Sequence, residues 1–277
     1  MEDARRQISL SPLKDEDRIV LDRLREFGNA WIVGGWVRDV LSGFSPELIA
    51  DIDIATNLTP VEVKAIFPRS IMVGEKFGTV IVRIDGSNNR DYECEVTTLR
   101  EDGGYSDGRR PENVVFGQEI ENDLARRDFT INSIALELPS WQIIDPFNGQ
   151  EHLSQGLLRT PLSPEIAFSE DPLRMLRAAR FTSRYQLVPE RGVEEAISEM
   201  ALRLAIVSKE RINDEMTKFL MVDKPSAGIS LLKRTGLIRQ IFSMSASTEL
   251  ADFELIRPEA LDMISPHLGM RWAALLW

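Results

Sequence analysis

The sequence has few of the residues on which disulfides and zinc sites depend. Among 277 residues it has one cysteine, Cys94, and two histidines, His152 and His267. A single cysteine forms no internal disulfide, which is typical of a reducing cytosol, and three such residues are too few for a structural zinc site. Any bound metal would have to be held by carboxylates, which favours Mg2+ or a similar hard cation.

Long apolar runs and an excess of positive charge are also missing. No run approaches the roughly 20 residues of a membrane helix, which argues against a spanning protein. The first residues, MEDARRQISL, have no apolar core of a secretory signal, so we expect a cytoplasmic protein. With 33 basic against 44 acidic residues, the net charge of −11 argues against indiscriminate nucleic-acid binding but leaves room for a local basic groove.

Hydrophobic periodicity divides the chain into two parts. Before about residue 160, short β-branched runs predict strands, and between them lie segments with helical spacing. The predicted strands are 31–33, 52–55, 80–84 and 92–98, and the predicted helices are 14–27, 36–42 and 60–67. After about residue 163 the strand signal disappears, and helices are predicted at 171–185, 190–201, 208–221 and 225–235.

This pattern predicts an α+β protein with a small mixed sheet at its start. We expect a head at residues 1–160, a helical neck at 161–235 and the start of a helical body at 236–277. The sequence stops in RWAALLW, an apolar helix-like run without a cap, so we expect the helical part to be incomplete.

The most distinctive local pattern is DIDI, in which Asp51 and Asp53 alternate with isoleucines on a predicted strand. Alternation sends both aspartates to one face, where two carboxylates about 7 Å apart repel each other unless a cation lies between them. Such a pair suits a two-metal site, although for an isolated pair the solvated face of an edge strand is the preferred explanation. On a later strand, Glu95 would complete a carboxylate triad, with Glu93 as its nearest rival.

A glycine turn lies one predicted helix before this pair. Gly34 and Gly35 follow a strand and open a helix, where glycines permit close backbone approach and free N–H groups suit a phosphate. Arg38, on the first helical turn, can add a guanidinium fork to the same phosphate. A Gly-Gly turn is more often only a tight connection, so its weight comes from its place beside the acidic pair.

Together these segments resemble the nucleotidyltransferase head shared by tRNA CCA-adding enzymes and bacterial poly(A) polymerases, the class II branch. The matching stretches occur in family order over about residues 31–181, and six ordered motifs are far more specific than any one of them. They are WIVGGWVRDVLSG, ADIDIAT, EVTTLR, DLARRDFTINSIA, IIDPFNGQEHL and SEDPLRMLRAARF.

The resemblance implies a polymerase β-like head, a reaction and a set of site residues. The 3′ end of a tRNA would attack the α-phosphate of CTP or ATP, and pyrophosphate would leave. Asp51 and Asp53 would bind Mg2+ and, with Glu95, form the catalytic set. The implied nucleotide-binding residues are Gly34, Gly35, Arg38, Arg126, Arg127, Asn132, Asp171, Arg174, Arg177 and Arg180.

The segment EDPLRMLR suggests how a base would be selected. Residues three apart share a helix face, so Asp171, Arg174 and Arg177 line up, with Arg180 after them. Cytosine and adenine each present an amino donor beside a ring-nitrogen acceptor, which aspartate and arginine match; uracil and guanine do not. An unmatched buried polar group costs about 1–3 kcal/mol. Without the resemblance, a surface ladder of ion pairs would be the preferred explanation of the spacing.

Two further segments bear on the substrate. Residues 100–117 include Gly103, Gly104 and Gly108 together with Arg109 and Arg110, which predicts a flexible loop similar to the mobile loop of relatives that add the terminal A. In relatives the helical part contacts tRNA by shape and backbone. Here that part carries the basic residues Arg180, Arg184, Arg203, Lys209, Arg211 and Lys218.

Three functions remain open at this point. The favoured one is addition of CCA, or of its last A, to tRNA. A poly(A) polymerase would use the same chemistry, and a catalytically inactive RNA-binding relative is a third hypothesis, against which the complete carboxylate set argues. The sequence leaves the oligomeric state open.

Overall fold

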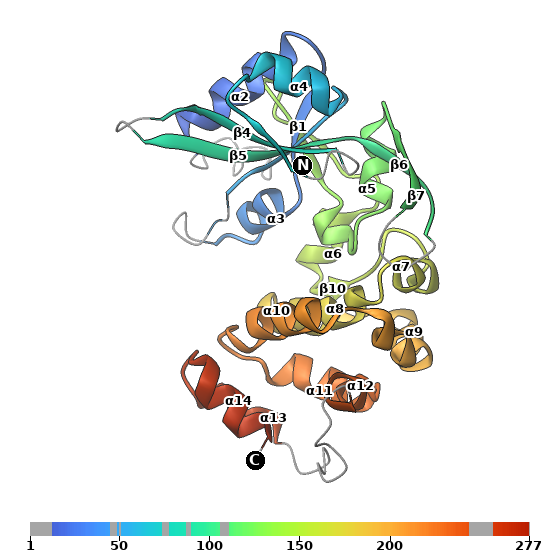
Figure 1. Cartoon of the computed structure of the whole chain (residues 1–277). Helices are drawn as coiled ribbons and strands as arrows, with labels where there is room; N and C mark the ends of the chain where they lie inside the picture. Colours follow the sequence, from blue (N-terminus) through green and yellow to red (C-terminus); the bar gives the residue numbers. More distant parts are fainter. Residues whose placement is uncertain are drawn as a thin grey trace. The chain divides into compact units, whose positions relative to one another are not determined.

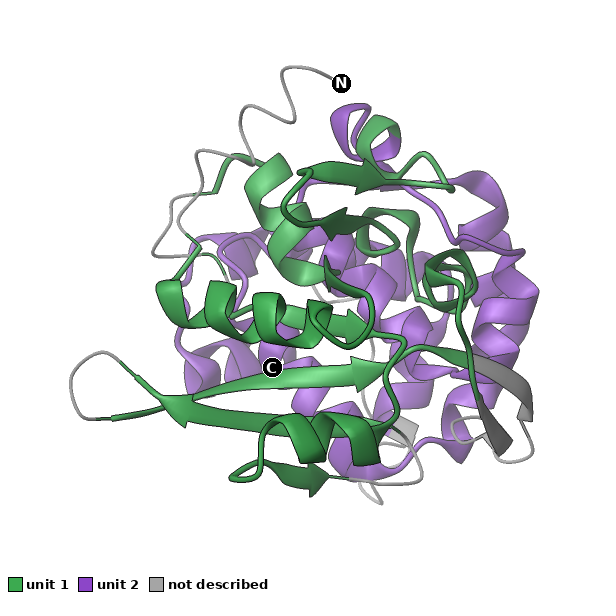
Figure 2. Cartoon of the chain, turned by 90° about the horizontal axis from the view of Figure 1, so that it is seen from above, with its two compact units in different colours: residues 1–104, 111–151 green, residues 105–110, 152–277 purple. Residues whose placement is uncertain are grey.

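The structure, a computed structural model, describes residues 13–44, 49, 51–73, 78–86, 90–105, 111–243 and 257–276, with the backbone alone at 101–105, 111–115, 243 and 276. The chain divides into two compact units (Figure 2). Unit 1 comprises Met1–Gly104 and Pro111–Glu151, and unit 2 comprises Tyr105–Arg110 and His152–Trp277. The expected boundaries of head, neck and body stay predictions.

A seven-stranded mixed sheet organises unit 1, as the sequence predicts. Its strand order is β3-β4-β5-β2-β1-β8-β9. β2 and β5 are parallel, and the other neighbouring strands are antiparallel. The strands are β1 (Ala30–Val33), β2 (Asp53–Thr56), β3 (Ile71–Val73), β4 (Thr79–Asp85), β5 (Asp91–Thr98), β8 (Ala135–Glu137) and β9 (Gln142–Ile144).

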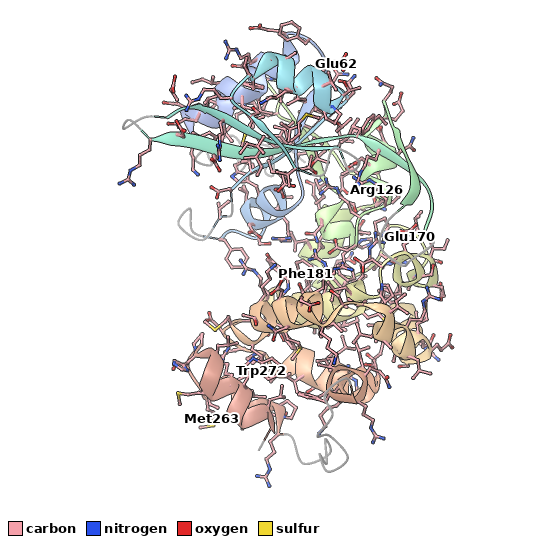
Figure 3. All side chains as sticks on the ribbon, in the orientation of Figure 1. Glu62, Arg126, Glu170, Phe181, Met263 and Trp272 are labelled. Atoms are coloured by element: carbon pink, nitrogen blue, oxygen red, sulfur yellow. The ribbon has the colours of Figure 1, made fainter. Side chains whose placement is uncertain are left out.

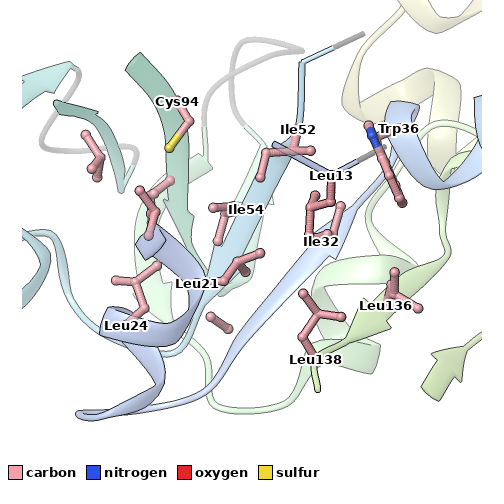
Figure 4. Close-up of a cluster of buried hydrophobic side chains, with 14 of the residues drawn as sticks. Leu13, Leu21, Leu24, Ile32, Trp36, Ile52, Ile54, Cys94, Leu136 and Leu138 are labelled. Carbon is pink, nitrogen blue, oxygen red and sulfur yellow. The ribbon is translucent and has the colours of Figure 1, made fainter. Parts of the chain in front are cut away.

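Helices cover the sheet because its strands present apolar side chains alternately to both faces. Helices α2 (Asp15–Arg25) and α4 (Pro60–Ile66) lie together over one face (Figure 1). There Leu21 and Leu24 pack with Ile32 and Ile54 of the central strands (Figure 4). A smaller cluster on alternate strand positions, including Trp31, contacts α5 (Ile120–Ala125). The remaining helical elements of this unit are α3 (Gly35–Leu41), the 3₁₀ turn η3 (Thr130–Asn132) and α6 (Gly149–Ser154).

Two expectations for unit 1 need correction. β2 begins at Asp53, so Asp51 precedes the strand, although the alternation of exposed and buried side chains already holds from Asp51 to Ile54. Residues 100–117 are not a plain loop. They contain β6 (Arg100–Tyr105) and β7 (Pro111–Phe116), which pair in a separate two-stranded sheet, while residues 106–110 lie outside the described residues.

Unit 2 is helical, with one short exception. Two-residue strands β10 (Leu157–Leu158) and β11 (Val188–Pro189) pair in parallel, so some strand does occur beyond residue 163. The helical elements are α7 (Pro164–Glu170), α8 (Leu173–Arg184), α9 (Arg191–Met200), η4 (Ala201–Ile206), α10 (Lys209–Leu220), α11 (Ser226–Arg234), α12 (Leu237–Ser243), α13 (Pro258–Asp262) and α14 (Leu268–Leu276).

A buried arginine joins the end of α10 to the last helix. Arg271 on α14 has no exposed surface, and its guanidinium donates five hydrogen bonds to four backbone carbonyls. The accepting carbonyls belong to Leu220, Val222, Asp223 and Ile264. Because the last carbonyls of a helix have no partner within the helix, Arg271 satisfies groups that would otherwise be left unpaired.

Within the residues that the structure describes, none of the helices has the length and apolar character needed to cross a membrane.

Candidate active site

The parallel pairing of β2 with β5 brings two acidic residues side by side. In this register Asp53 lies opposite Glu95. Glu93, two residues earlier on β5, lies outside the pairing with β2 and opposite Arg83 of β4, from which it accepts a hydrogen bond. The register therefore distinguishes two glutamates that sequence alternation alone treats as equivalent, and Glu95 is the one beside Asp53.

Opposing charges act on Asp53. Surrounding protein atoms displace enough water to raise the pKa of its carboxyl, although part of the side chain remains accessible. The guanidiniums of Arg127 and Arg38 oppose this rise, and the carboxylate of Asp51 adds to it. Burial, together with the charge of Asp53, also raises the pKa of Glu95. Asp53 thus lies close enough to both Asp51 and Glu95 for their charges to interact with it.

Asp51 has a partner that the sequence analysis missed. The Nζ of Lys14 donates to its Oδ1 at 2.7 Å, and both side chains are more than half exposed, at 54% for Lys14 and 79% for Asp51. This hydrogen bond raises the pKa of Lys14, and partial burial opposes the rise. No local sequence pattern predicts this contact, because the two residues are 37 positions apart.

The donor set around Asp53 fits a hard divalent cation. Within the described part of the chain, no group of three or more histidine, cysteine or acidic side chains lies close enough to hold a metal ion. Protein side chains thus supply at most the two carboxylates of Asp51 and Asp53 as direct ligands in the described residues, which leaves the other coordination positions of a cation to water or substrate. Magnesium is commonly bound in this way, by one or two carboxylates, with waters and substrate phosphates completing its shell. Mutual repulsion of the pair also favours a cation between them.

The glycine turn lies against the acidic pair. Gly34 has a φ of +70°, a backbone conformation that residues other than glycine rarely adopt, and it directly precedes α3. A Cβ at Gly34 would come within 2.8 Å of Nη1 of Arg127 and 3.8 Å of Oδ2 of Asp53. A Cβ at Gly35 would lie 3.5 Å from Nη2 of Arg38. The absence of side chains thus allows the backbone to approach two guanidiniums and a carboxylate.

Hydrogen bonds hold the guanidinium of Arg38 in place. Its Nη2 donates to Oδ1 of Asp39 at 2.7 Å, and its Nη1 donates to the side-chain oxygen of Asn132. Asn132 in turn donates to Oδ1 of Asp128 at 2.8 Å. All four side chains are buried, so this network fixes Arg38 and Asn132 relative to each other.

A second network holds the paired arginines that follow α5. Arg126 and Arg127 both donate to the buried carboxylate of Asp123 (Figure 3 labels Arg126). Burial alone would raise the pKa of Asp123, but the two guanidiniums outweigh it and hold that pKa below its ordinary value. The Nε of Arg127 is buried with no hydrogen-bond partner. The two predicted residues are therefore fixed side chains and not a solvated helix face.

In unit 2, the predicted row of residues is only partly on one helix. Arg174, Arg177 and Arg180 lie on α8, but α8 begins at Leu173, so Asp171 precedes it. Oδ1 of Asp171 accepts from the backbone N–H of Leu173, the first residue of α8, at 3.1 Å, while Pro172 is the N-cap residue of that helix. The prediction that Asp171 belongs to the helix is wrong, because Pro172 stands at the position where the helix begins.

Neighbouring side chains orient the first two members of the row. Arg174 donates to Oε2 of Glu170 at 3.0 Å and to the carbonyl of Ala167 at 3.2 Å (Figure 3 labels Glu170). Asp171 accepts, through Oδ2, from Nη2 of Arg211 at 2.7 Å. Both oxygens of Asp171 therefore have a fixed donor.

Helix α10 supplies two residues that the sequence analysis did not assign to the site. Besides Arg211, it carries Glu215, whose side chain is only 3% exposed and accepts from Arg180. Arg177 lies 3.9 Å from the same carboxylate and 5.4 Å from the ring of Phe181 (Figure 3 labels Phe181). The i, i+4 spacing of Arg211 and Glu215 was the available signal, since it places both on one face of α10.

The acidic pair at the start of β2, with Glu95 beside it and a glycine turn that opens α3, is the arrangement expected of a nucleotidyltransferase head. Residues 30–159 match the family described as "Poly A polymerase head domain". Residues 188–248 match the family described as "Probable RNA and SrmB- binding site of polymerase A". The chain belongs to the family of class II tRNA nucleotidyltransferases and bacterial poly(A) polymerases, which confirms the predicted family and fold class.

Individual relatives agree with this assignment. The CCA-adding enzyme of Geobacillus kaustophilus is 41% identical over 232 residues, which are 83% of this chain and 55% of the relative. The solved structure of the Bacillus stearothermophilus CCA-adding enzyme in complex with CTP is similar with a TM-score of 0.71 and 39% identity, over 81% of this chain and 53% of that one. A solved tRNA nucleotidyltransferase complexed with a primer tRNA and an incoming ATP analog is similar with a TM-score of 0.64 and 26% identity, over 80% of this chain and 62% of that one. The chain spans about half the length of the curated relatives it matches.

Proposed function

We propose that this chain carries out the addition of CCA, or of its terminal A, to the 3′ ends of tRNA. The nucleotides would come from CTP and ATP, without a nucleic-acid template, and pyrophosphate would be released. The names of the relatives support this proposal, as does the binding of CTP, of an ATP analog and of a primer tRNA by solved relatives. A tRNA substrate and a single cysteine favour the cytoplasm.

The observation that carries the proposal is the β2–β5 register, which sets Glu95 beside Asp53 within the field of Arg127 and Arg38. We assign Asp51 and Asp53 as the residues that hold Mg2+. When bound, the ion would stabilise negative charge on the phosphoryl oxygens and help to activate the attacking hydroxyl. Glu95, as the third carboxylate, adds the negative charge that favours a divalent cation over a monovalent one.

The residues around the glycine turn are assigned to the triphosphate and the sugar. Gly34 and Gly35 leave the backbone open to close approach by a phosphate. Arg38, Arg126 and Arg127 would supply positive charge where the transferring phosphate and pyrophosphate develop negative charge. Since the networks of Asp39 and Asp123 already hold these arginines, little reorganisation is needed when the substrate binds. Asn132, joined to Arg38, is assigned to the sugar.

The residues at the start of α8 are assigned to base selection. Asp171 would accept from the amino group that cytosine and adenine share, and Arg174 would donate to the adjacent ring nitrogen. Arg211 and Glu170 hold these two side chains in defined orientations. Arg177 and Arg180 follow on the same helix, where Glu215 holds them, and we assign them supporting contacts with the nucleotide.

Poly(A) polymerase activity is the second candidate. The descriptions of both matching families name that enzyme, and the chemistry at Asp53 would be the same. The two activities differ in when addition stops and in which RNA is accepted.

One assay distinguishes these functions. Labelled tRNA transcripts ending before the CCA, after its second C, or with the complete CCA are incubated with Mg2+ and with CTP, ATP or both. CCA addition predicts two C, then one A, then a stop. A-addition predicts extension only of the transcript that ends in CC. Continued A incorporation on unrelated RNA would favour the polymerase, and no incorporation by any transcript would contradict both. Asp53→Asn, purified in parallel, is the inactive control.

A further inference from the structure

Lys14 provides the positive charge at Asp51, the first member of the acidic pair. Its ammonium donates to Asp51 at 2.7 Å and also lies 5.6 Å from the centre of the Tyr92 ring. Arg38 and Arg127 act on Asp53, so each member of the pair has cationic protein groups beside it.

The fold fixes the backbone from which Lys14 extends. Leu13, just before it, is buried in the core. The backbone N–H of Lys14 donates to Oδ2 of Asp17 at 3.1 Å, and Asp17 also accepts from the hydroxyl of Tyr92 on β5. Helix α2 continues from this point with Val20 buried against the sheet. The backbone of Lys14 is thus held in place, and only its side chain has to move to make or break the contact with Asp51.

The side chain itself can leave without cost to the core. Its exposed fraction of 54% means that rotation into solvent uncovers little apolar surface. Asp17 and Glu16 also attract the ammonium, so it has other carboxylates nearby when it leaves Asp51. An exposed ion pair of this kind is weak, which is what a displaceable contact requires.

We propose that Lys14 is a built-in counter-ion of Asp51, which a divalent cation must displace in order to bind, and that Lys14 thereby sets the metal affinity of the site. This inference rests on the proposed function, because it takes Asp51 as a metal ligand. In the metal-free protein Lys14 reduces the repulsion between Asp51 and Asp53. On metal binding the ammonium moves away, and the cation takes over the same role.

The test measures Mn2+ binding directly, by the paramagnetic resonance signal of free Mn2+, in the absence of nucleotide. Lys14→Met should bind Mn2+ about two- to fivefold more tightly than the wild type, the range that an exposed ion pair can account for. Lys14→Arg should stay near the wild type. The matched control is Arg25→Met, which removes one positive charge from the last turn of the same helix, where Arg25 faces Asp22 at 3.6 Å. Thermal unfolding verifies that each variant is folded.

The outcomes separate this inference from the proposed function. If Asp51→Asn binds Mn2+ as tightly as the wild type, Asp51 is no ligand, and both the role of Lys14 and the assignment of Asp51 to the metal are overturned, whereas nucleotide addition itself is tested by the transcript assay. If binding depends on Asp51 but Lys14→Met matches Arg25→Met, only the role of Lys14 is overturned. Weaker binding by Lys14→Met would also overturn it, since Lys14 would then support the ligand and not compete with the metal.

Discussion

Replacing Arg211 by methionine tests whether α10 positions Asp171, the residue proposed to select the base. The change removes the 2.7 Å contact to Asp171 and leaves the methylene portion of the side chain largely in place. A hydrogen bond to a charged group contributes about 1.5–3 kcal/mol, and an exposed ion pair about 0–1 kcal/mol. Because both side chains are about one-fifth exposed, we take a value between these limits, about 1–2 kcal/mol.

This loss should appear in the choice of nucleotide. If Asp171 accepts from cytosine and adenine, kcat/KM for CTP and ATP should fall about 5- to 30-fold. The same parameter for UTP, which does not offer that amino group, should change little. Discrimination would then fall by the same factor. The assay is incorporation at saturating tRNA on a transcript that ends before the CCA, for CTP and UTP, and on one that ends in CC, for ATP.

The control removes a charge from the same helix without a contact to Asp171. Lys218 on α10 is exposed, and Lys218→Met should leave nucleotide choice unchanged. An equal fall of kcat/KM for CTP, ATP and UTP in Arg211→Met would refute the positioning role. So would an unchanged selectivity in a folded variant.

Two further predictions concern unit 1. Glu95→Gln should lower kcat at least about tenfold, because a negative charge beside Asp53 is lost. Glu93→Gln should lose only the ion pair with Arg83 on the neighbouring strand and keep its kcat. Equal kcat values in the two variants would contradict the assignment of Glu95 as the third carboxylate. Gly34→Ala should cost about 1–3 kcal/mol of folding free energy for its backbone conformation, and it should also raise KM for CTP by displacing Arg127. Gly236, with the same φ of +70° and open space around it, is the matched control: Gly236→Ala should show the stability loss in a denaturant titration without the change in KM.

Local patterns were sufficient for most elements that carry the site. The alternation of aspartate with isoleucine predicts the burial pattern from Asp51 to Ile54, where β2 begins, and the two glycines predict the turn into α3. In both cases the signal lies within a few adjacent residues, where strand and helix periodicity apply directly. The start of α8 was also within reach, because an Asp-Pro pair is itself a helix-start signal and places Asp171 before the first turn.

Contacts between distant residues were not predictable in the same way. The choice between Glu93 and Glu95 depends on the register of β5 against β2, and a shift of two residues leaves the same face exposed. The partners of Asp51 and Asp171 are 37 and 40 residues away in sequence. The chain contains 33 basic residues, and their spacing does not identify which one meets which carboxylate. Only the packing of α2 on the sheet and of α10 beside α8 determines these pairs.

Arg271 links α14, the last helix that the structure describes, to α10, whose Arg211 and Glu215 contact the residues proposed to select the base. Its guanidinium closes the carboxyl end of α10, the helix whose earlier turns bear Arg211 and Glu215. Every donor it offers goes to a main-chain oxygen, so no shorter or differently shaped side chain reproduces the set. We therefore expect a substitution of Arg271 to loosen the carboxyl end of α10. If Asp171 selects the base as proposed, the accuracy of nucleotide choice would then depend on a residue of α14 that has no part in base recognition.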